Sequence, residues 1–151
     1  MGKPHRIAAG GFIFKNNRVL LVRYQNNSGG TFLVAPGGGL EEDENIVQAV
    51  IRETKEETGI SVNPRRVAAI EDLMCSQYKM IKVWMISEFV AGEIKKTEEA
   101  AKEDIIEAAW FTREQLEKEV VYPTTLIQHD WKELQAESWQ VECLPSRTAN
   151  F

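Results

Sequence analysis

The stretch that decides the fold runs from Gly37 to Ile60 and reads GGGLEEDENIVQAVIRETKEETGI. Its second half predicts a helix from Asn45 to Thr58, because Asn45 suits an N-cap, Gln48 stands at the capping-box position and Gly59 follows the end. Three consecutive glycines precede the helix, so main-chain groups there can approach a ligand without obstruction by side chains. We therefore expect the glycine turn and the helix to face the same substrate.

This helix places negative charge where its apolar pattern predicts a buried face. At about 100° per residue, the stripe that begins at Ile46 continues into Glu53, Glu56 and Glu57. Carboxylates at these spacings repel one another by roughly 0.2–0.5 kcal/mol per pair on an exposed helix, and by more when they are desolvated. Hard divalent cations favour such oxygens, and Mg²⁺ is usually held by a few carboxylates together with substrate phosphates. The three glutamates are therefore candidate metal ligands.

A solvated helix face is the alternative for the same residues. Glu53, Glu56 and Glu57 can pair with Arg52 and Lys55, and helices rich in glutamate and lysine are common. The coincidence of the acidic positions with the apolar stripe, and the glycines directly before the helix, favour the metal interpretation. Both interpretations stay open on the residues alone.

The spacing of the charged residues carries a family resemblance. Gly38 is followed after five residues by Glu44, and after seven more by RETKEETGI at Arg52 to Ile60. This pattern resembles the Nudix box of the MutT-like hydrolases, with every charged and glycine position filled. Thr54 is a departure, since the family usually has an aliphatic residue there and threonine adds a hydroxyl. The resemblance covers most of the chain through about Leu116.

The resemblance implies a fold, a reaction and a cofactor. It implies an α/β fold, a Nudix-type α/β/α sandwich with a mixed β-sheet. The implied activity is hydrolysis of a nucleoside diphosphate linked to another group, with Mg²⁺ or Mn²⁺ held by Glu53, Glu56 and Glu57 and with Gly38 near the metal. A sanitising nucleoside triphosphate pyrophosphohydrolase and a non-catalytic nucleotide sensor are the alternatives. Because many relatives are dimers, the resemblance also leaves a homodimer open.

The resemblance also suggests roles for individual residues. Arg52 would orient a neighbouring glutamate through charge-assisted hydrogen bonds. Glu53 is the first candidate for the general base, because the family draws its base from the box helix or from a later loop. The loop candidates are Glu98, Glu99 and Glu103, which lie in the charged connection after Gly92, and of these we favour Glu103.

Candidate substrate contacts lie on both sides of the box. Gly37, Gly38 and Gly39 can cradle an anion or a metal. Arg23 ends a strand and can pair with a phosphate, although a surface charge on an edge strand is an equal alternative. Tyr78 lies 18 residues beyond the box, a spacing similar to that of a tyrosine in the family's dinucleoside polyphosphate hydrolases. A proline typical of the ADP-ribose hydrolases is missing from this region, so ADP-ribose is not favoured over other dinucleotides.

Composition limits the class of protein. The 151 residues fit one domain, residues 1–151, in which residues 136–151 form a C-terminal extension without a clear period. Eighteen Lys and Arg against 23 Asp and Glu give a net charge of −5, which argues against long nucleic acids as partners. The partner that the resemblance implies is a small nucleotide substrate. No apolar run reaches the roughly 18 residues of a membrane span, and a signal-peptide pattern is missing. We therefore expect a cytoplasmic protein that does not bind membranes.

The remaining pattern predicts a mixed sheet flanked by helices. Strands are expected at Arg6 to Phe14, Val19 to Tyr24, Thr31 to Ala35, Val67 to Cys75, Tyr78 to Val90 and Ile105 to Phe111. Two further helices are expected, one from Thr112 to Glu119 and one that Pro123 opens and that runs through Leu134. In the extension, Trp139 and Leu144 are expected to pack back onto the core.

Overall fold

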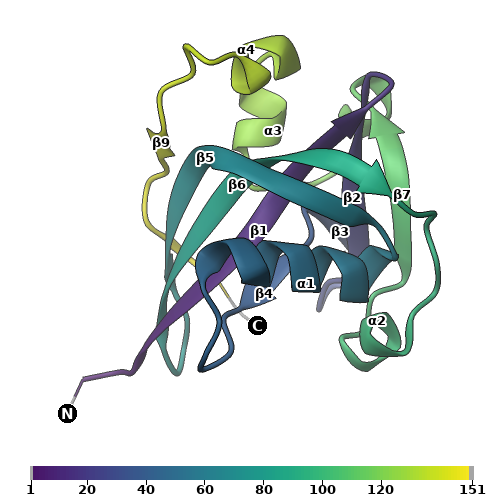
Figure 1. The fold of residues 1–151 in the computed structure, drawn as a ribbon. Helices are drawn as coiled ribbons and strands as arrows, with labels where there is room; N and C mark the ends of the chain where they lie inside the picture. The colour runs from purple at the N-terminus through teal and green to yellow at the C-terminus, as the bar shows by residue number, and fades with distance from the viewer. Residues whose placement is uncertain (1, 150–151) are drawn as a thin grey trace.

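The computed structural model describes residues 2–149 as a curled, mixed β-sheet with helices on both faces (Figure 1). The strands are β1 His5–Lys15, β2 Arg18–Gln25, β3 Thr31–Val34, β4 Gly37–Gly39, β5 Ser61–Met74, β6 Lys79–Ala91, β7 Glu107–Thr112, β8 Val121–Tyr122, β9 Glu142–Cys143 and β10 Arg147–Thr148. The helices are α1 Ile46–Thr58, α2 Glu98–Lys102, α3 Thr125–Gln128 and α4 Trp131–Gln135, and η1 Glu114–Leu116 is a 3-10 turn.

Strand β1 lies at the centre of the sheet. The strand order is β10-β5-β6-β1-β2-β3-β8, with β4 paired to β1, β7 to β2 and β9 to β5. The β1–β6 and β3–β8 pairs are parallel, whereas β5–β6 and β2–β7 are antiparallel, so the sheet is mixed as predicted. Between β1 and its parallel neighbour β6 the chain passes through β2, β3, β4, α1 and β5. Helix α1 packs against β1, β4 and β5.

Alternation along the strands builds one core on each face of the sheet. On one face, Ala49 and Val50 of α1 pack against Ile13 and Met85. On the other face, the cluster around Phe12 and Trp84 packs against the leucines of α3 and α4. Residues 12 and 13 point to opposite sides because successive strand side chains alternate. This arrangement gives the sandwich of helix, sheet and helix that the resemblance implied.

Local signals define α1 as predicted. Asn45 Oδ1 accepts from the Gln48 N–H at 2.8 Å, and Gln48 Oε1 accepts from the Asn45 N–H at 2.9 Å. At the other end Gly59 has φ 85°, the left-handed conformation that glycine adopts most easily. The helix is thus fixed at both ends by its own sequence, and one face remains to be buried against the sheet.

Two segments next to the helix differ from the sequence prediction. The strand expected from Val67 begins six residues earlier, at Ser61, because irregular pairing around Pro64 lets β5 continue past a residue that lacks an N–H. No strand was predicted in the glycine segment, but Gly37–Gly39 forms β4, which pairs antiparallel with Ala8, Ala9 and Gly10 of β1. The glycines are therefore held in place as well as unobstructed.

The later helices are shorter than predicted. Thr112 and Gln115 exchange side-chain bonds to each other's backbone N–H, but the segment that follows Thr112 is only the 3-10 turn η1 and not an α-helix. The expected final helix is two helices, because His129 is extended and Asp130 caps a new start by accepting from the N–H of residues 132 and 133. The chain therefore turns sharply between α3 and α4.

The C-terminal extension adds two parallel strands to β5. β9 pairs with Ala69 and Ile70, and β10 pairs with Leu73 and Met74. Trp139 Nε1 donates to the Ala68 carbonyl at 2.8 Å, and Leu144 packs on the larger core, which confirms the prediction for both. Within residues 2–149, no helix is both long and apolar enough to cross a membrane.

Candidate active site

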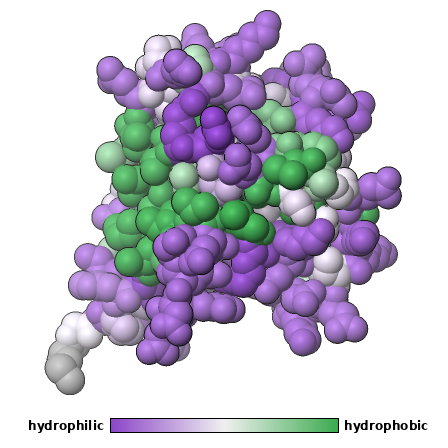
Figure 2. All heavy atoms as spheres, in the orientation of Figure 1, coloured by the Kyte–Doolittle hydropathy of each residue, from purple (hydrophilic) through white to green (hydrophobic). Residues whose placement is uncertain are grey.

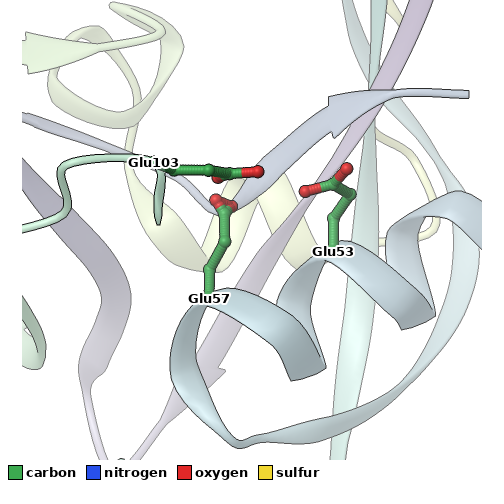
Figure 3. A group of neighbouring side chains, drawn as sticks. All are labelled: Glu53, Glu57 and Glu103. Atoms are coloured by element: carbon green, nitrogen blue, oxygen red, sulfur yellow. The ribbon is translucent and has the colours of Figure 1, made fainter. Parts of the chain in front are cut away.

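Three carboxylates meet beside the glycine strand (Figure 3). Glu53 and Glu57 rise from one face of α1, and Glu103 reaches toward them from the end of α2. One oxygen from each of the three lies within 4.8 Å of the others. Glu53 and Glu57 are 5% and 1% exposed, whereas Glu103 is exposed to solvent. The helix repeat brings two of these groups together, and the connection after β6 supplies the third.

Two buried oxygens of this cluster have no hydrogen-bond partner among the described residues, namely Glu53 Oε2 and Glu57 Oε2. An unpaired buried carboxylate is costly, since it loses water without gaining a donor or a cation. Hard oxygen donors, converging and negatively charged, are the ligands that Mg²⁺ and Mn²⁺ prefer. The cluster therefore fits a divalent cation.

Glu56 lies apart from this group. Its Oε2 accepts from Arg52 Nη1 at 3.1 Å, and its side chain is 32% exposed. The sequence analysis grouped Glu56 with Glu53 and Glu57, but the structure brings Glu103 into the third place of the cluster. The assignment of Glu56 to metal binding stays a prediction.

Arg52 ties the helix to the segment before it. Its Nε and Nη2 donate to Glu44 at 2.6 and 2.8 Å, its Nη1 donates to Glu53 Oε1 at 3.0 Å, and its Nη2 also donates to the Gly39 carbonyl at 3.0 Å. These charge-assisted bonds lower the pKa of Glu44. They also hold one oxygen of Glu53, so that its unpaired Oε2 has a defined direction.

The glycine strand lies directly against the carboxylates. The Gly37 N–H donates to Glu57 Oε1 at 2.7 Å. A Cβ on residue 38 would come within 2.6 Å of Glu53 Oε1, so a side chain at Gly38 would displace that carboxylate. The triple glycine thus serves close approach between backbone and carboxylates, in addition to strand pairing.

A pocket of about 450 Å³ opens from the glycine strand. Its aromatic lining consists of Tyr24, Phe32, Tyr78, Trp84 and Tyr122, and its charged lining consists of Glu71, Lys82 and Arg147. Gly37 and Gly38 form the wall that separates it from the carboxylate cluster. This size and mainly apolar lining are typical of small-molecule sites.

Comparison with known proteins places the fold and the box in one family. The NUDIX domain family model matches residues 4–132. The chain belongs to the Nudix family. The expected family and its α/β fold are therefore confirmed.

Individual Nudix relatives differ in the substrates that their names state. An ADP-ribose pyrophosphatase of Methanocaldococcus jannaschii is 31% identical over 114 residues, which cover 74% of this chain and 64% of the relative. The human 8-oxo-dGDP phosphatase NUDT18 is 31% identical over 122 residues, 79% of this chain and 34% of the relative. A solved NUDIX hydrolase from Nitrosomonas europaea is 27% identical, with a TM-score of 0.64 over 76% of each chain. The chain spans less than two thirds of both sequence relatives.

Burial governs the charges of this Nudix site. It raises the pKa of Glu57 well above its ordinary value, and it raises the pKa of Glu53, with a further contribution from the Glu103 carboxylate. Burial likewise lowers the pKa of Lys82, which lies near the negative charge of Glu57 and Glu71. Burial and the charge of Glu57 also raise the pKa of the Tyr24 phenol. The same electric field thus reaches from the carboxylates into the pocket.

Arg23, a predicted phosphate contact, already has protein partners in this Nudix domain. Its Nε donates to Glu107 at 2.9 Å, its Nη2 donates to Glu119 at 3.0 Å, and its Nη1 donates to Thr31 Oγ1 at 2.8 Å. Strand β2 pairs with β3 on one side and β7 on the other, so the edge-strand alternative is wrong. Arg23 does not line the pocket, and its phosphate role stays a prediction, whereas the candidate Tyr78 does line it.

Three charged pocket residues were missed by the sequence analysis, namely Glu71, Lys82 and Arg147. Lys82 lies two positions before the buried Trp84, so both side chains share one face of the strand. The alternation of the strand could therefore have indicated that this lysine points to the interior. Glu71 is 4% exposed near the C-terminal end of β5, where the pattern predicted only a strand. Arg147 belongs to the C-terminal extension, whose apolar residues follow neither a helical nor a strand repeat, so the sequence did not indicate its position.

Proposed function

We propose that the chain is a divalent-metal-dependent hydrolase that cleaves the diphosphate linkage of a nucleoside diphosphate joined to another group. The observation that carries this proposal is the pair of unpaired, buried carboxylate oxygens of Glu53 and Glu57, which belong to a cluster with Glu103 next to a nucleotide-sized pocket. Family membership supports it, and the names of the two sequence relatives both describe hydrolysis at phosphates of nucleotides.

Glu53, Glu57 and Glu103 would hold Mg²⁺ or Mn²⁺. When bound, such a cation supplies positive charge to the diphosphate oxygens and makes water a better nucleophile near neutral pH. Arg52 orients Glu53 through its Nη1, and the Gly37 N–H fixes Glu57. Either Glu53 or Glu103 accepts the proton of the attacking water, with Glu53 as the first candidate and the more solvent-accessible Glu103 as the loop alternative.

The pocket would take the nucleoside, and Lys82 would lie between the two parts of the substrate. Its Nζ stands 4.3 Å above the centroid of the Trp84 ring on the pocket wall, and its charge acts on Glu57 across the glycine strand. A cation at this junction can neutralise phosphate oxygens while the aromatic side chains stack on a base. Tyr78, with Arg6 4.3 Å from its ring centroid, would form the rim.

Product analysis by phosphorus NMR tests the reaction. The chain is incubated with Mg²⁺ and with dinucleoside polyphosphates, ADP-ribose, nucleotide sugars and nucleoside triphosphates in turn. We expect two phosphorylated fragments from a linked diphosphate. Release of inorganic diphosphate from triphosphates alone would favour the sanitising activity instead, and nucleotide binding without turnover across the panel would favour a sensor.

The proposed partner is a small nucleotide, and a homodimer stays a prediction. Figure 2 shows that apolar surface remains on the face that carries α1 and the neighbouring strands. On this helix Val47 and Ile51 are 41% and 40% exposed. Size-exclusion chromatography with light scattering would measure whether a second copy associates.

A further inference from the structure

The C-terminal extension contributes one wall of the pocket. Strand β10 adds in parallel to β5, with Arg147 opposite Leu73 and Thr148 opposite Met74. Arg147, Thr148 and Ala149 all line the pocket, although they lie outside the segment that matches the family model. A feature of this chain beyond the matched domain therefore shapes the space next to the glycine strand.

Arg147 is held in a fixed orientation at this wall. Its Nε donates to Glu71 Oε2 at 3.3 Å, and its Cζ lies 4.3 Å from the centroid of the Tyr122 ring. Glu71 is in turn fixed through Oε1, which accepts from Trp84 Nε1 at 2.7 Å. A guanidinium that is stacked and anchored through Nε loses little freedom when its other nitrogens bind a ligand.

The remaining donors of Arg147 are available to a ligand. Within residues 2–149, its Nη1 and Nη2 have no hydrogen-bond partner, whereas both oxygens of Glu71 already accept. The charged lining therefore offers two cations, Arg147 and Lys82, and one carboxylate, Glu71, each of whose oxygens accepts from a protein donor. The two remaining nitrogens of Arg147 match a ligand edge with two acceptors, whereas an amino group on that edge would meet another donor.

We propose that Arg147 selects a guanine-type base by donating to its O6 and N7 acceptors. Guanine presents these two acceptors side by side, a pattern that the arginine fork matches, whereas adenine presents an amino donor beside N7. The aromatic residues Tyr24, Phe32 and Tyr122 supply stacking surface for the ring. This inference names the base of the substrate and rests on the function proposed above.

Titration calorimetry without metal measures the base preference directly, with GMP, AMP and 8-oxo-GMP as ligands. We expect GMP to bind about 5- to 160-fold more tightly than AMP, which is the range that about 1–3 kcal/mol of discrimination from one bidentate contact gives. We expect 8-oxo-GMP to bind more weakly than GMP, because oxidation places a hydrogen on N7. Equal binding of GMP and AMP, or tighter binding of 8-oxo-GMP than of GMP, would overturn the proposal.

Two variants assign the preference to the fork of Arg147. Arg147→Ala is expected to lower GMP affinity about 10-fold and to leave AMP affinity unchanged, and Arg147→Lys is expected to lose most of the preference while keeping the charge. Arg65→Ala, on the exposed face of β5 with an ion pair to Glu88, removes the same charge outside the pocket and should change neither affinity. Equal losses for both ligands in Arg147→Lys, which keeps a cation at the wall, would overturn the role in base selection.

Hydrolysis of a matched substrate pair separates this inference from the proposed function. With Mg²⁺, diguanosine and diadenosine tetraphosphate present the same linkage with different bases. We expect Arg147→Ala to raise KM for the guanosine substrate about 10-fold with little change in kcat. If wild type hydrolyses neither these two substrates nor any other linked diphosphate of the panel but still prefers GMP, the function fails and the base selection stands. If it hydrolyses both equally, the base selection fails.

Discussion

Two groups of glutamates in this molecule differ in how their charge is compensated. Glu107 and Glu119 both accept from Arg23, whose third nitrogen is bonded to Thr31. Glu53 and Glu57 are more deeply buried, yet each keeps one oxygen without a partner within residues 2–149. Most buried polar groups in proteins are paired, so the exceptions need an explanation. The paired group supports the fold, and the unpaired group indicates a ligand.

The two groups also differ in what lies next to them. The Arg23 cluster links β2, β3 and β7 with the segment before β8, and its donors are used. The carboxylates around Glu57 instead border a glycine strand that admits no side chain at Gly38. Arg52 and the Gly37 N–H each satisfy one oxygen of this pair, but the second oxygen of Glu53 and of Glu57 has no partner among the described residues, which is the feature that the proposed metal site accounts for.

The largest expected effect is on turnover. Glu57→Gln keeps an acceptor for the Gly37 N–H and nearly the same volume, but it removes a buried charge. We expect kcat/KM with Mg²⁺ to fall by roughly 100-fold or more, about 3 kcal/mol at the transition state. We expect the thermal midpoint without metal to be unchanged or higher, because a desolvated carboxylate is gone.

The matched control is Glu119→Gln in the compensated group. This variant also removes one negative charge, but from a cluster outside the pocket. Its kcat/KM should stay within about 2-fold of wild type while its stability falls slightly. Unchanged turnover in Glu57→Gln, or an equal loss in both variants, would show that the unpaired oxygens have no particular role in turnover.

The second prediction concerns metal without substrate. Mg²⁺ or Mn²⁺ at about 100 times its dissociation constant should stabilise the fold by about 2.7 kcal/mol, a rise in thermal midpoint of roughly 5–10 °C for a chain of this size. Differential scanning fluorimetry with and without a chelator measures it. The shift should disappear in Glu57→Gln and persist in Glu119→Gln. A shift of the same size in both variants would place the cation elsewhere.

Local signals explain how much of this site the sequence could predict. The capping box at Asn45, the end at Gly59 and the apolar stripe define α1, and the helix repeat then places Glu53 and Glu57 on one buried face. The box adds Arg52, whose bonds to Glu44 and Glu53 span only eight positions or fewer. These features were predictable because each depends on residues within a few turns of the helix.

Other features depend on contacts between distant segments. Glu103 reaches the cluster because the Lys95 N–H donates to the Thr58 carbonyl and Thr97 Oγ1 donates to the Glu56 carbonyl, and no local pattern indicates either bond. Arg147 and Glu71 are separated by 76 positions, and the strands β9 and β10 that bring them together have only two residues each, which is too short to show an alternating apolar pattern. Local patterns therefore predicted the helix side of the site, and the family resemblance added Glu103 and Tyr78 as candidates. The charged wall of the pocket stayed undetermined.

The third prediction tests the compensated group itself. Arg23→Gln should lower the free energy of unfolding by about 1 kcal/mol, because two carboxylates lose a partner in partly solvated positions. KM should not change, since Arg23 does not line the pocket. Urea unfolding and steady-state kinetics measure the two quantities. Arg65→Gln, whose ion pair is exposed, should stay within about 0.5 kcal/mol.

The opposite result would restore the interpretation made from the sequence. If Arg23→Gln raised KM for every substrate and left stability unchanged, Arg23 would act on phosphate and its bonds to Glu107 and Glu119 would give way on binding. Glu107 and Glu119 would then no longer be an example of glutamates whose partner serves only the fold.

The smallest expected effect uses two threonines of α1 that differ in the same way as the two glutamate groups. Thr54 and Thr58 are both 0% exposed. Thr58 Oγ1 donates to the Thr54 carbonyl at 2.6 Å and accepts from the Ile60 N–H at 3.2 Å, whereas Thr54 Oγ1 has no partner among the described residues. Valine has nearly the shape of threonine, a similar helix propensity and no hydroxyl.

Thr54→Val should therefore stabilise the fold by about 1 kcal/mol, because it removes an unpaired buried hydroxyl, and Thr58→Val should destabilise it by about 1–2 kcal/mol, because it leaves the Ile60 N–H without its acceptor. Urea midpoints at constant m-value measure both changes. Thr54 lies on the same helix face as the carboxylates, so kcat should stay within about 2-fold if the hydroxyl has no role in the site. A loss of both stability and turnover in Thr54→Val would instead mean that this hydroxyl, like the oxygens of Glu53 and Glu57, is kept unpaired for a ligand.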